Sequence, residues 1–277
     1  FDGSKFDGSA SLEDPNIRLN LAGLIDLAKK RPVYKFTADI QNLTPNKLNL
    51  TKDFPNLTAG LHMEANLQGD LMKDADGSVI FTNINLLNGG QEYNLSHLTL
   101  NALPTFENNN RLDINSDLIS GYFQGKFNFI KLPKDITYIA AKYLPSLLHT
   151  SERYAAFNNF AFNLKVDPNQ ADELFSVLAL PIQIENGASL EGNVNSDSRQ
   201  LNFTLDIPTL TSKTSHFSKL RFTCDNPREM MQITAKGMIL QSNNTVMNLF
   251  ASAAAARDSV STRLMWDNSG KETYAGE

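Results

Sequence analysis

The sequence predicts a mainly-β protein, either an elongated antiparallel β-groove (a taco-like half-pipe) or an open sandwich of about a dozen strands. Two observations support this fold class. Apolar and polar residues alternate along most of the chain, as in strands with one apolar and one polar face. Turn-forming residues separate these stretches at short intervals, and helical spacing occurs only in the middle of the chain.

The clearest alternation runs from Leu57 to Leu71, where odd positions are apolar or small and even positions are polar or glycine. Globular strands usually have roughly 5–6 residues. We therefore expect one unusually long, two-faced strand over 57–71 and another from Leu112 to Phe129. The Asp2-Gly3 and Asp7-Gly8 pairs each predict a tight turn, because glycine readily adopts the positive φ that such turns need.

The spacing changes between 133 and 148, where apolar residues recur three and four positions apart. This stripe predicts one central amphipathic helix, which Pro145 should kink or shorten. Its members are Ile136, Ile139, Ala140, Tyr143, Leu144, Leu147 and Leu148. A second, short helix is expected after Asp167, an N-cap residue followed by Pro168.

These patterns divide the chain into three sections. Residues 1–130 are expected to form a first β-groove section, 131–180 a helix-containing insertion or cap, and 181–277 a second β-groove section. The sequence begins with Phe1 and contains no run of roughly 18–20 apolar residues that could span a membrane as a helix. We interpret the whole as a fragment of a longer protein.

Composition argues against several functions. The formal net charge of −5 disfavours nucleic acid as a partner, because phosphates call for a basic face. The single cysteine, Cys224, is expected to be a small buried apolar residue, and the four histidines lack partners at metal-ligand spacing. No nucleophile motif occurs. We expect no catalytic residues, no metal, no cofactor and no enzymatic activity.

The apolar strand faces carry the functional hypotheses. They could be the dry packed core of a structural or adhesive all-β scaffold. Alternatively, they could line an open groove that holds lipid acyl chains, which the strand length favours. The candidate groove residues are Leu57, Leu61, Met63, Leu67, Leu190, Val194, Leu201, Phe203, Leu205, Met231, Ile233 and Ile239.

Three stretches resemble the TamB and AsmA-like family, nearest to the versions in Bacteroidetes-type bacteria. They are the alternation over 61–71, the segment Gly125 to Phe129 leading into the Leu-Pro start of the helix at 132–148, and the closing 265–269. The similarity covers most of the chain, as an internal segment, and is one of faces and turns without a catalytic signature.

The resemblance implies a periplasmic location, in a full-length protein anchored in the inner membrane. It also implies a β-groove with an apolar inside, phospholipid acyl chains as cargo and an outer-membrane barrel partner that binds parts outside this segment. The expected role is phospholipid transport, outer-membrane protein assembly, or both. A central helix at 133–148 is more than expected for the most regular members of this family. It could be a cap or plug on the groove, or the packing lid of a closed domain.

Overall fold

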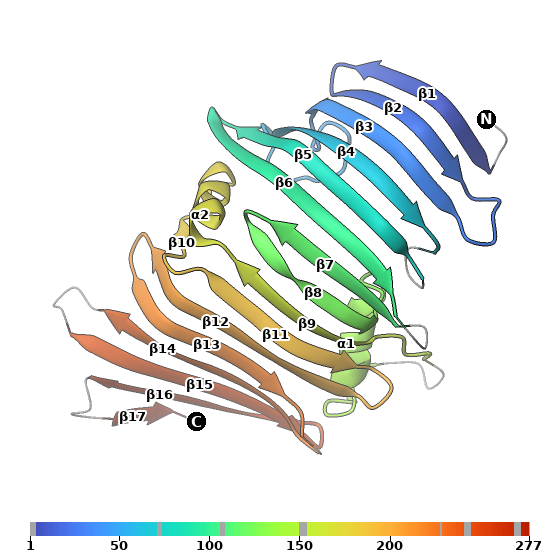
Figure 1. Ribbon diagram of the computed structural model, residues 1–277. Helices are drawn as coiled ribbons and strands as arrows, with labels where there is room; N and C mark the ends of the chain where they lie inside the picture. The colour runs from blue at the N-terminus through green and yellow to red at the C-terminus, as the bar shows by residue number, and fades with distance from the viewer. Residues whose placement is uncertain are drawn as a thin grey trace. The chain divides into compact units, whose positions relative to one another are not determined.

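The computed structural model describes residues 4–70, 74–105, 109–149, 154–227, 229–240, 245–268 and 273–276. These residues form seventeen strands and two helices, and every strand pairing described is antiparallel (Figure 1). The mainly-β, antiparallel prediction with two helices is therefore confirmed. The strands outnumber the expected dozen partly because the Asp7-Gly8 pair lies inside a strand and forms no turn. The other predicted turn, at Asp2-Gly3, lies outside the described residues.

The chain divides into two compact units, which differ from the three sections expected from the sequence. Unit 1 comprises Phe1–Tyr122 and Gln170–Pro181, and unit 2 comprises Phe123–Asn169 and Ile182–Glu277. The expected helix-containing section at 131–180 is thus shared between the units.

In unit 1, each strand from β1 to β7 pairs with the next along the chain as a meander. The strands are β1 (Lys5–Asp14), β2 (Ile17–Asp26), β3 (Val33–Leu43), β4 (Thr58–Gln68), β5 (Asp76–Asn88), β6 (Gln91–Pro104) and β7 (Asn110–Ser116). They form a single layer, and no second sheet packs on it among the described residues. Helix α2 (Pro168–Val177) contributes most of its length to this unit.

In unit 2, the ladder runs β9, β11, β12, β13, β14, β15, β16, β17, and the short β10 also pairs with β12. The strands are β9 (Asn159–Val166), β10 (Ile182–Gln183), β11 (Ala188–Asn195), β12 (Gln200–Ser212), β13 (His216–Asp225), β14 (Met231–Leu240), β15 (Val246–Ala256), β16 (Ser259–Asn268) and β17 (Thr273–Gly276). Helix α1 (Leu132–Ala140) also belongs to this unit.

Two long strands expected from the sequence are shorter in the structure. Strand β4 ends at Gln68, because Gly69 has a φ of 98° and leaves the extended conformation, and Leu71 lies outside the described residues. The expected strand over 112–129 is divided into β7 and β8 (Ile119–Lys126) by a turn at 117–118. The Ser116 hydroxyl stabilises this turn by accepting hydrogen bonds from the backbone N–H groups of Leu118 and Ile119.

The central helix is also shorter than the predicted 133–148. It ends at Ala140, and only turns follow as far as Pro145. The predicted stripe therefore holds only in part: Ile139 and Tyr143 are buried, whereas Leu147 is 70 % exposed. A stripe needs a continuous helix to keep its residues on one face.

A buried carboxylate holds α1 in place within unit 2. Asp135 is fully buried in the first turn of the helix. It accepts hydrogen bonds from the Tyr154 hydroxyl (2.5 Å), the Ser196 hydroxyl (2.8 Å), the backbone N–H groups of Phe157 (3.2 Å) and Asn158 (2.8 Å), and the Asn158 side chain (2.7 Å). Figure 1 draws α1 beside the start of β9 and the end of β11.

These hydrogen bonds determine the charge state of Asp135. Burial alone would raise the pKa of this carboxyl, but the bonds from Tyr154, Asn158 and Ser196 outweigh it and lower the pKa below the ordinary value. Burial and the same contact raise the pKa of Tyr154 to about 12, so its phenol stays a donor. The carboxylate is therefore a negative charge enclosed by neutral donors.

The segment after α1 is held at a second point in unit 2. The buried Asn226 side chain donates to the Tyr143 hydroxyl (3.0 Å) and accepts from the backbone N–H of Leu201 (2.8 Å). The backbone N–H of Asp258 donates to the Tyr143 carbonyl (2.9 Å), and the Asp258 carboxylate accepts from Ser146. Residues 135–146 are thus joined to the turns that follow β11, β13 and β15.

We predict that Asp135→Ala lowers the free energy of unfolding by about 3–5 kcal/mol, because several buried donors lose their charged acceptor. Urea unfolding followed by circular dichroism measures this change. Asp197→Ala, at an exposed aspartate in the β11–β12 turn, is the matched control and should stay within about 0.5 kcal/mol of the parent chain. Equal stability of both variants would contradict a structural role for Asp135.

The lowered pKa also predicts a pH dependence. Ionised Asp135 favours the folded state, so its contribution is fully present above the unfolded-state pKa of about 3.9 and is lost as the pH falls through the lower folded-state pKa. Asp135→Asn cannot lose this contribution on acidification. Its deficit in unfolding free energy should therefore be largest at neutral pH and shrink in acid, and a deficit that does not depend on pH would refute this explanation.

Candidate apolar binding face

Apolar residues form continuous rows across the sheet of unit 1, because the strand registers bring apolar positions opposite one another. One row crosses seven strands and ends at a serine: Ala10, Leu21, Ala38, Met63, Phe81, Leu98 and Ser116. The next row contains Gly8, Gly23, Phe36, Ala65, Val79, Leu100 and Ile114. Since alternate residues share a face of a strand, these rows make one apolar surface.

The opposite face of unit 1 is polar. Lys35, Asn66, Ser78, Asn101 and Asp113 lie in register across β3 to β7. This face also holds the pair Asp39 and His62, whose side chains lie 2.7 Å apart across β3 and β4. The sheet is therefore two-faced, with its polar side able to meet water.

Unit 2 has apolar rows of its own. One contains Phe162, Gly192, Phe203, Cys224, Ile233 and Ala253, and ends at Thr262. Another contains Leu164, Leu190, Leu205, Phe222, Ala235, Ala251 and Leu264. Gly192 lets β12 approach closely, since a Cβ at this position would collide with the Cα and Cβ atoms of Phe203.

The predicted groove residues fall on these rows to different degrees. In unit 1, Met63 lies on the first row, Leu67 lies opposite Tyr34, Leu61 lies opposite Ile40, and Leu57 lies just before β4. In unit 2, three pairs lie opposite each other or on one row: Leu190 with Leu205, Val194 with Leu201, and Phe203 with Ile233. Met231 lies opposite Ala255, and Ile239 lies between Phe217 and Met247.

The exposure of the predicted groove residues indicates how far other parts of the chain cover the apolar faces. Leu67, Val194, Leu201 and Met231 are buried, whereas Ile233 is 47 % exposed. The other seven predicted residues are half-buried. Side chains in the middle of a sandwich core are mostly buried on both sides, so half-buried rows indicate faces with little cover.

Other members of the rows were missed by the sequence reasoning, chiefly on β5 and β6. The apolar set changes from odd to even positions between Phe81 and Ile84, next to Asn83, which has a positive φ of 52°. On β6, the apolar set also changes from odd to even positions, between Leu95 and Leu98, which lie opposite Ile84 and Phe81 of β5. An interrupted alternation of this kind is the sequence signal of a bulge.

Helix α2 covers one end of the apolar face of unit 1. Val177 packs with the buried Tyr93 and Leu95 of β6, and half-buried Leu174 lies against the same cluster. The Asn88 side chain donates to the Val177 carbonyl (2.8 Å), which satisfies the end of the helix. Burial raises the pKa of Tyr93 to about 12, with the nearby charges of Glu173 and Asp117 adding to the shift.

Five phenylalanines form an aromatic cluster in unit 2 where β8 ends and β9 begins. The ring centroids of Phe123 and Phe129 lie 4.9 Å apart in an edge-on arrangement, and Phe127 and Phe129 stack at 5.3 Å. Phe160 and Phe162 of β9 complete the cluster. The ring centroid of Phe123 lies 5.9 Å from that of Phe160 and 6.2 Å from that of Phe162. The cluster continues the apolar rows beyond β9.

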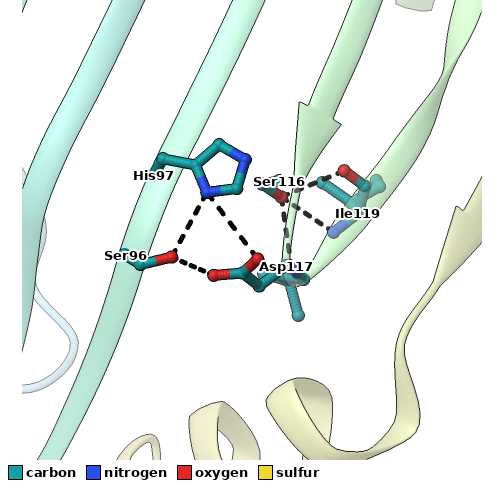
Figure 2. A network of polar contacts seen from close by, with 6 residues as sticks. Ser96, His97, Ser116, Asp117 and Ile119 are labelled. Atoms are coloured by element: carbon teal, nitrogen blue, oxygen red, sulfur yellow. Dashed lines mark hydrogen bonds and ion pairs between the residues drawn. The ribbon is translucent and has the colours of Figure 1, made fainter.

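Ser96, His97 and Asp117 are the residue types of a hydrolase triad, but their hydrogen bonds are not arranged as catalysis requires (Figure 2). The Ser96 hydroxyl donates directly to the Asp117 carboxylate, and the Nδ1 atom of His97 lies 3.2 Å from that hydroxyl and 3.7 Å from the carboxylate. A triad needs the two histidine nitrogens on separate partners, with serine bonded to the base. This set is a polar network beside the β7–β8 turn.

The described residues hold no group of three or more His, Cys, Asp or Glu side chains that could bind a metal ion. Cys224 is buried, as expected, and burial with the charge of Asp225 raises the pKa of its thiol to about 11. A protonated, buried thiol is a poor nucleophile. None of the described helices is both long and apolar enough to cross a membrane.

We predict that Gly192→Ala destabilises the protein by about 1–3 kcal/mol, because the added methyl group would overlap the backbone of Asn202 and Phe203. Gly276→Ala is the matched control, since a Cβ there meets no atom within 4 Å. Thermal unfolding of the two variants measures the difference. An unchanged melting temperature for Gly192→Ala would mean that β11 and β12 are less closely paired than the structure shows.

Comparison of the chain with protein-family models, with curated proteins and with solved structures finds no match in any of the three.

Proposed function

We propose that this chain is a non-enzymatic segment that shields lipid acyl chains, as a section of a TamB or AsmA-like bridge in the periplasm. The observation that carries the proposal is the set of apolar rows, which cross seven strands in unit 1 and stay largely half-buried. Their length suits an extended apolar ligand better than a compact one.

The physical mechanism is burial of hydrocarbon. Each acyl CH₂ group moved from water onto the apolar rows gains about 0.8 kcal/mol. A chain of about sixteen carbons would gain on the order of 10 kcal/mol before the costs of ordering lipid and protein are subtracted. The polar row from Lys35 to Asp113 keeps the other face of unit 1 in contact with water.

The cellular setting is part of the same proposal. The full-length protein is anchored in the inner membrane, and parts outside this segment bind an outer-membrane barrel partner. Its role is outer-membrane biogenesis, through phospholipid transport, outer-membrane protein assembly, or both. The resemblance of 61–71, 125–129 and 265–269 to that family supports this setting.

The competing function is a structural or adhesive scaffold with a dry core. Helix α2 favours it locally, because it covers Tyr93 and Leu95. The half-buried rows around Met63 and Phe203 favour lipid instead, because a dry core should bury them. Native mass spectrometry of the gently purified chain, followed by lipid extraction, distinguishes the two: a scaffold gives a clean apo mass and takes up no added lipid.

We predict that Met63→Asp and Phe203→Asp each reduce co-purifying phospholipid severalfold, because a charge in the row opposes contact with hydrocarbon. Native mass spectrometry and binding of an apolar fluorescent probe measure the loss. The matched controls are Asn66→Asp and Asn202→Asp, which add the same charge to the polar faces of the same strands.

Circular dichroism accompanies each variant in that experiment. Lipid loss without loss of fold in the apolar-face variants, with both controls retaining lipid, supports the proposal. If Met63→Asp and Phe203→Asp unfold and the parent chain never carries lipid, both side chains belong to an ordinary core and the scaffold function stands.

A further inference from the structure

The turn between β8 and α1 presents two apolar side chains to solvent. Ile130 is 79 % exposed, more than any other large apolar side chain in the described part of the chain, and Phe129 is 40 % exposed. Single exposed apolar residues are common on protein surfaces. Here two adjacent apolar residues are exposed in one turn, and their exposure depends on how that turn is held.

Hydrogen bonds fix the conformation of this turn. The backbone N–H of Asn128 donates to the Asn158 side chain (2.7 Å), and Asn158 in turn donates to the buried Asp135. Lys131 and Leu132 close the turn by donating their backbone N–H groups to the Asn128 carbonyl (3.1 and 3.0 Å). Phe129 rests on Phe123 and Phe127, which leaves Ile130 outermost.

Exposed lysines surround the same turn. The ammonium groups of Lys126 and Lys131 both lie over the Phe157 ring, 4.5 and 4.8 Å from its centroid, and are therefore near each other. Lys134 is exposed one turn further on. None of these three lysines has an ion-pair partner among the described residues.

The local charge contrasts with that of the whole chain, which is −5. Asp135 is the only acidic residue between 126 and 149, and it is buried beneath five hydrogen bonds. The surface of residues 126–134 thus combines two exposed apolar side chains with three lysines that have no ion-pair partner in the described part of the chain. An anionic bilayer can bind both groups, because the apolar side chains enter the acyl boundary while the lysines bind lipid phosphates.

We propose that residues 126–134 dock unit 2 on the surface of an anionic lipid bilayer, with Phe129 and Ile130 inserted and Lys126, Lys131 and Lys134 at the phosphates. A fluid bilayer needs no shape-matched groove to receive these exposed apolar side chains, which favours it over a folded protein partner. This membrane contact goes beyond the proposed acyl-chain binding and does not depend on it.

Sedimentation of the whole chain with vesicles tests the proposal. The vesicles contain phosphatidylcholine and phosphatidylglycerol in equal parts, with pure phosphatidylcholine for comparison. We expect binding to the anionic vesicles, a loss of about fivefold in affinity for each of Lys131→Glu and Lys134→Glu, and a loss of at least as much for Ile130→Asp. Raised salt should weaken the binding of the parent chain.

Matched controls keep the test specific. Leu50→Asp changes an apolar side chain of unit 1 that is 68 % exposed, and Lys47→Glu changes an exposed lysine of the same unit; both should bind like the parent chain. Phe203→Asp should also still bind vesicles, which separates this contact from the proposed cargo site. No binding to anionic vesicles, full binding by Ile130→Asp, or equal losses in the controls would each overturn the proposal.

Discussion

The structure depends on the register of its antiparallel ladders. Side chains alternate with a period of two, so a slip of one residue between neighbouring strands would move a whole apolar set to the opposite face. In unit 1, the registers keep Leu21, Ala38, Met63 and Phe81 opposite one another. Where the apolar set shifts along β5, it shifts along β6 at the facing position, so the rows continue across the irregularity.

Unit 2 adds a different kind of constraint at the ends of its strands. Asp135 and Asn226 are polar, buried and satisfied by partners from several turns, whereas the rows along the strands are apolar. Hydrogen bonds fix geometry more narrowly than apolar contact does, because unsatisfied buried donors are costly. Polar contacts therefore hold the first turn of α1, and the adjoining turn at 128–131 is hydrogen-bonded to the same network through Asn158.

Local patterns in the sequence predict much of this fold, and contacts between distant residues are what they miss. The alternation over 57–71 gives the two faces of β4, but Gly69 ends the strand earlier than the pattern does. The stripe at 133–148 predicts that α1 forms, but it does not predict that the helix ends as early as Ala140. The Asp135 site joins residues up to 61 positions apart, and no spacing rule could have gathered Tyr154, Asn158 and Ser196 around it.

The path of the chain around α2 has a consequence for how the protein is made and divided. Residues 170–181 belong to unit 1, although the segments on both sides of them belong to unit 2. During synthesis, β1 to β7 emerge from the ribosome well before the helix that covers Tyr93 and Leu95. The apolar patch at Tyr93 and Leu95 therefore stays uncovered until the part of unit 2 that precedes α2 has been translated. A fragment cut after Tyr122 would keep the patch permanently exposed, so the two units are not separable by a single cut.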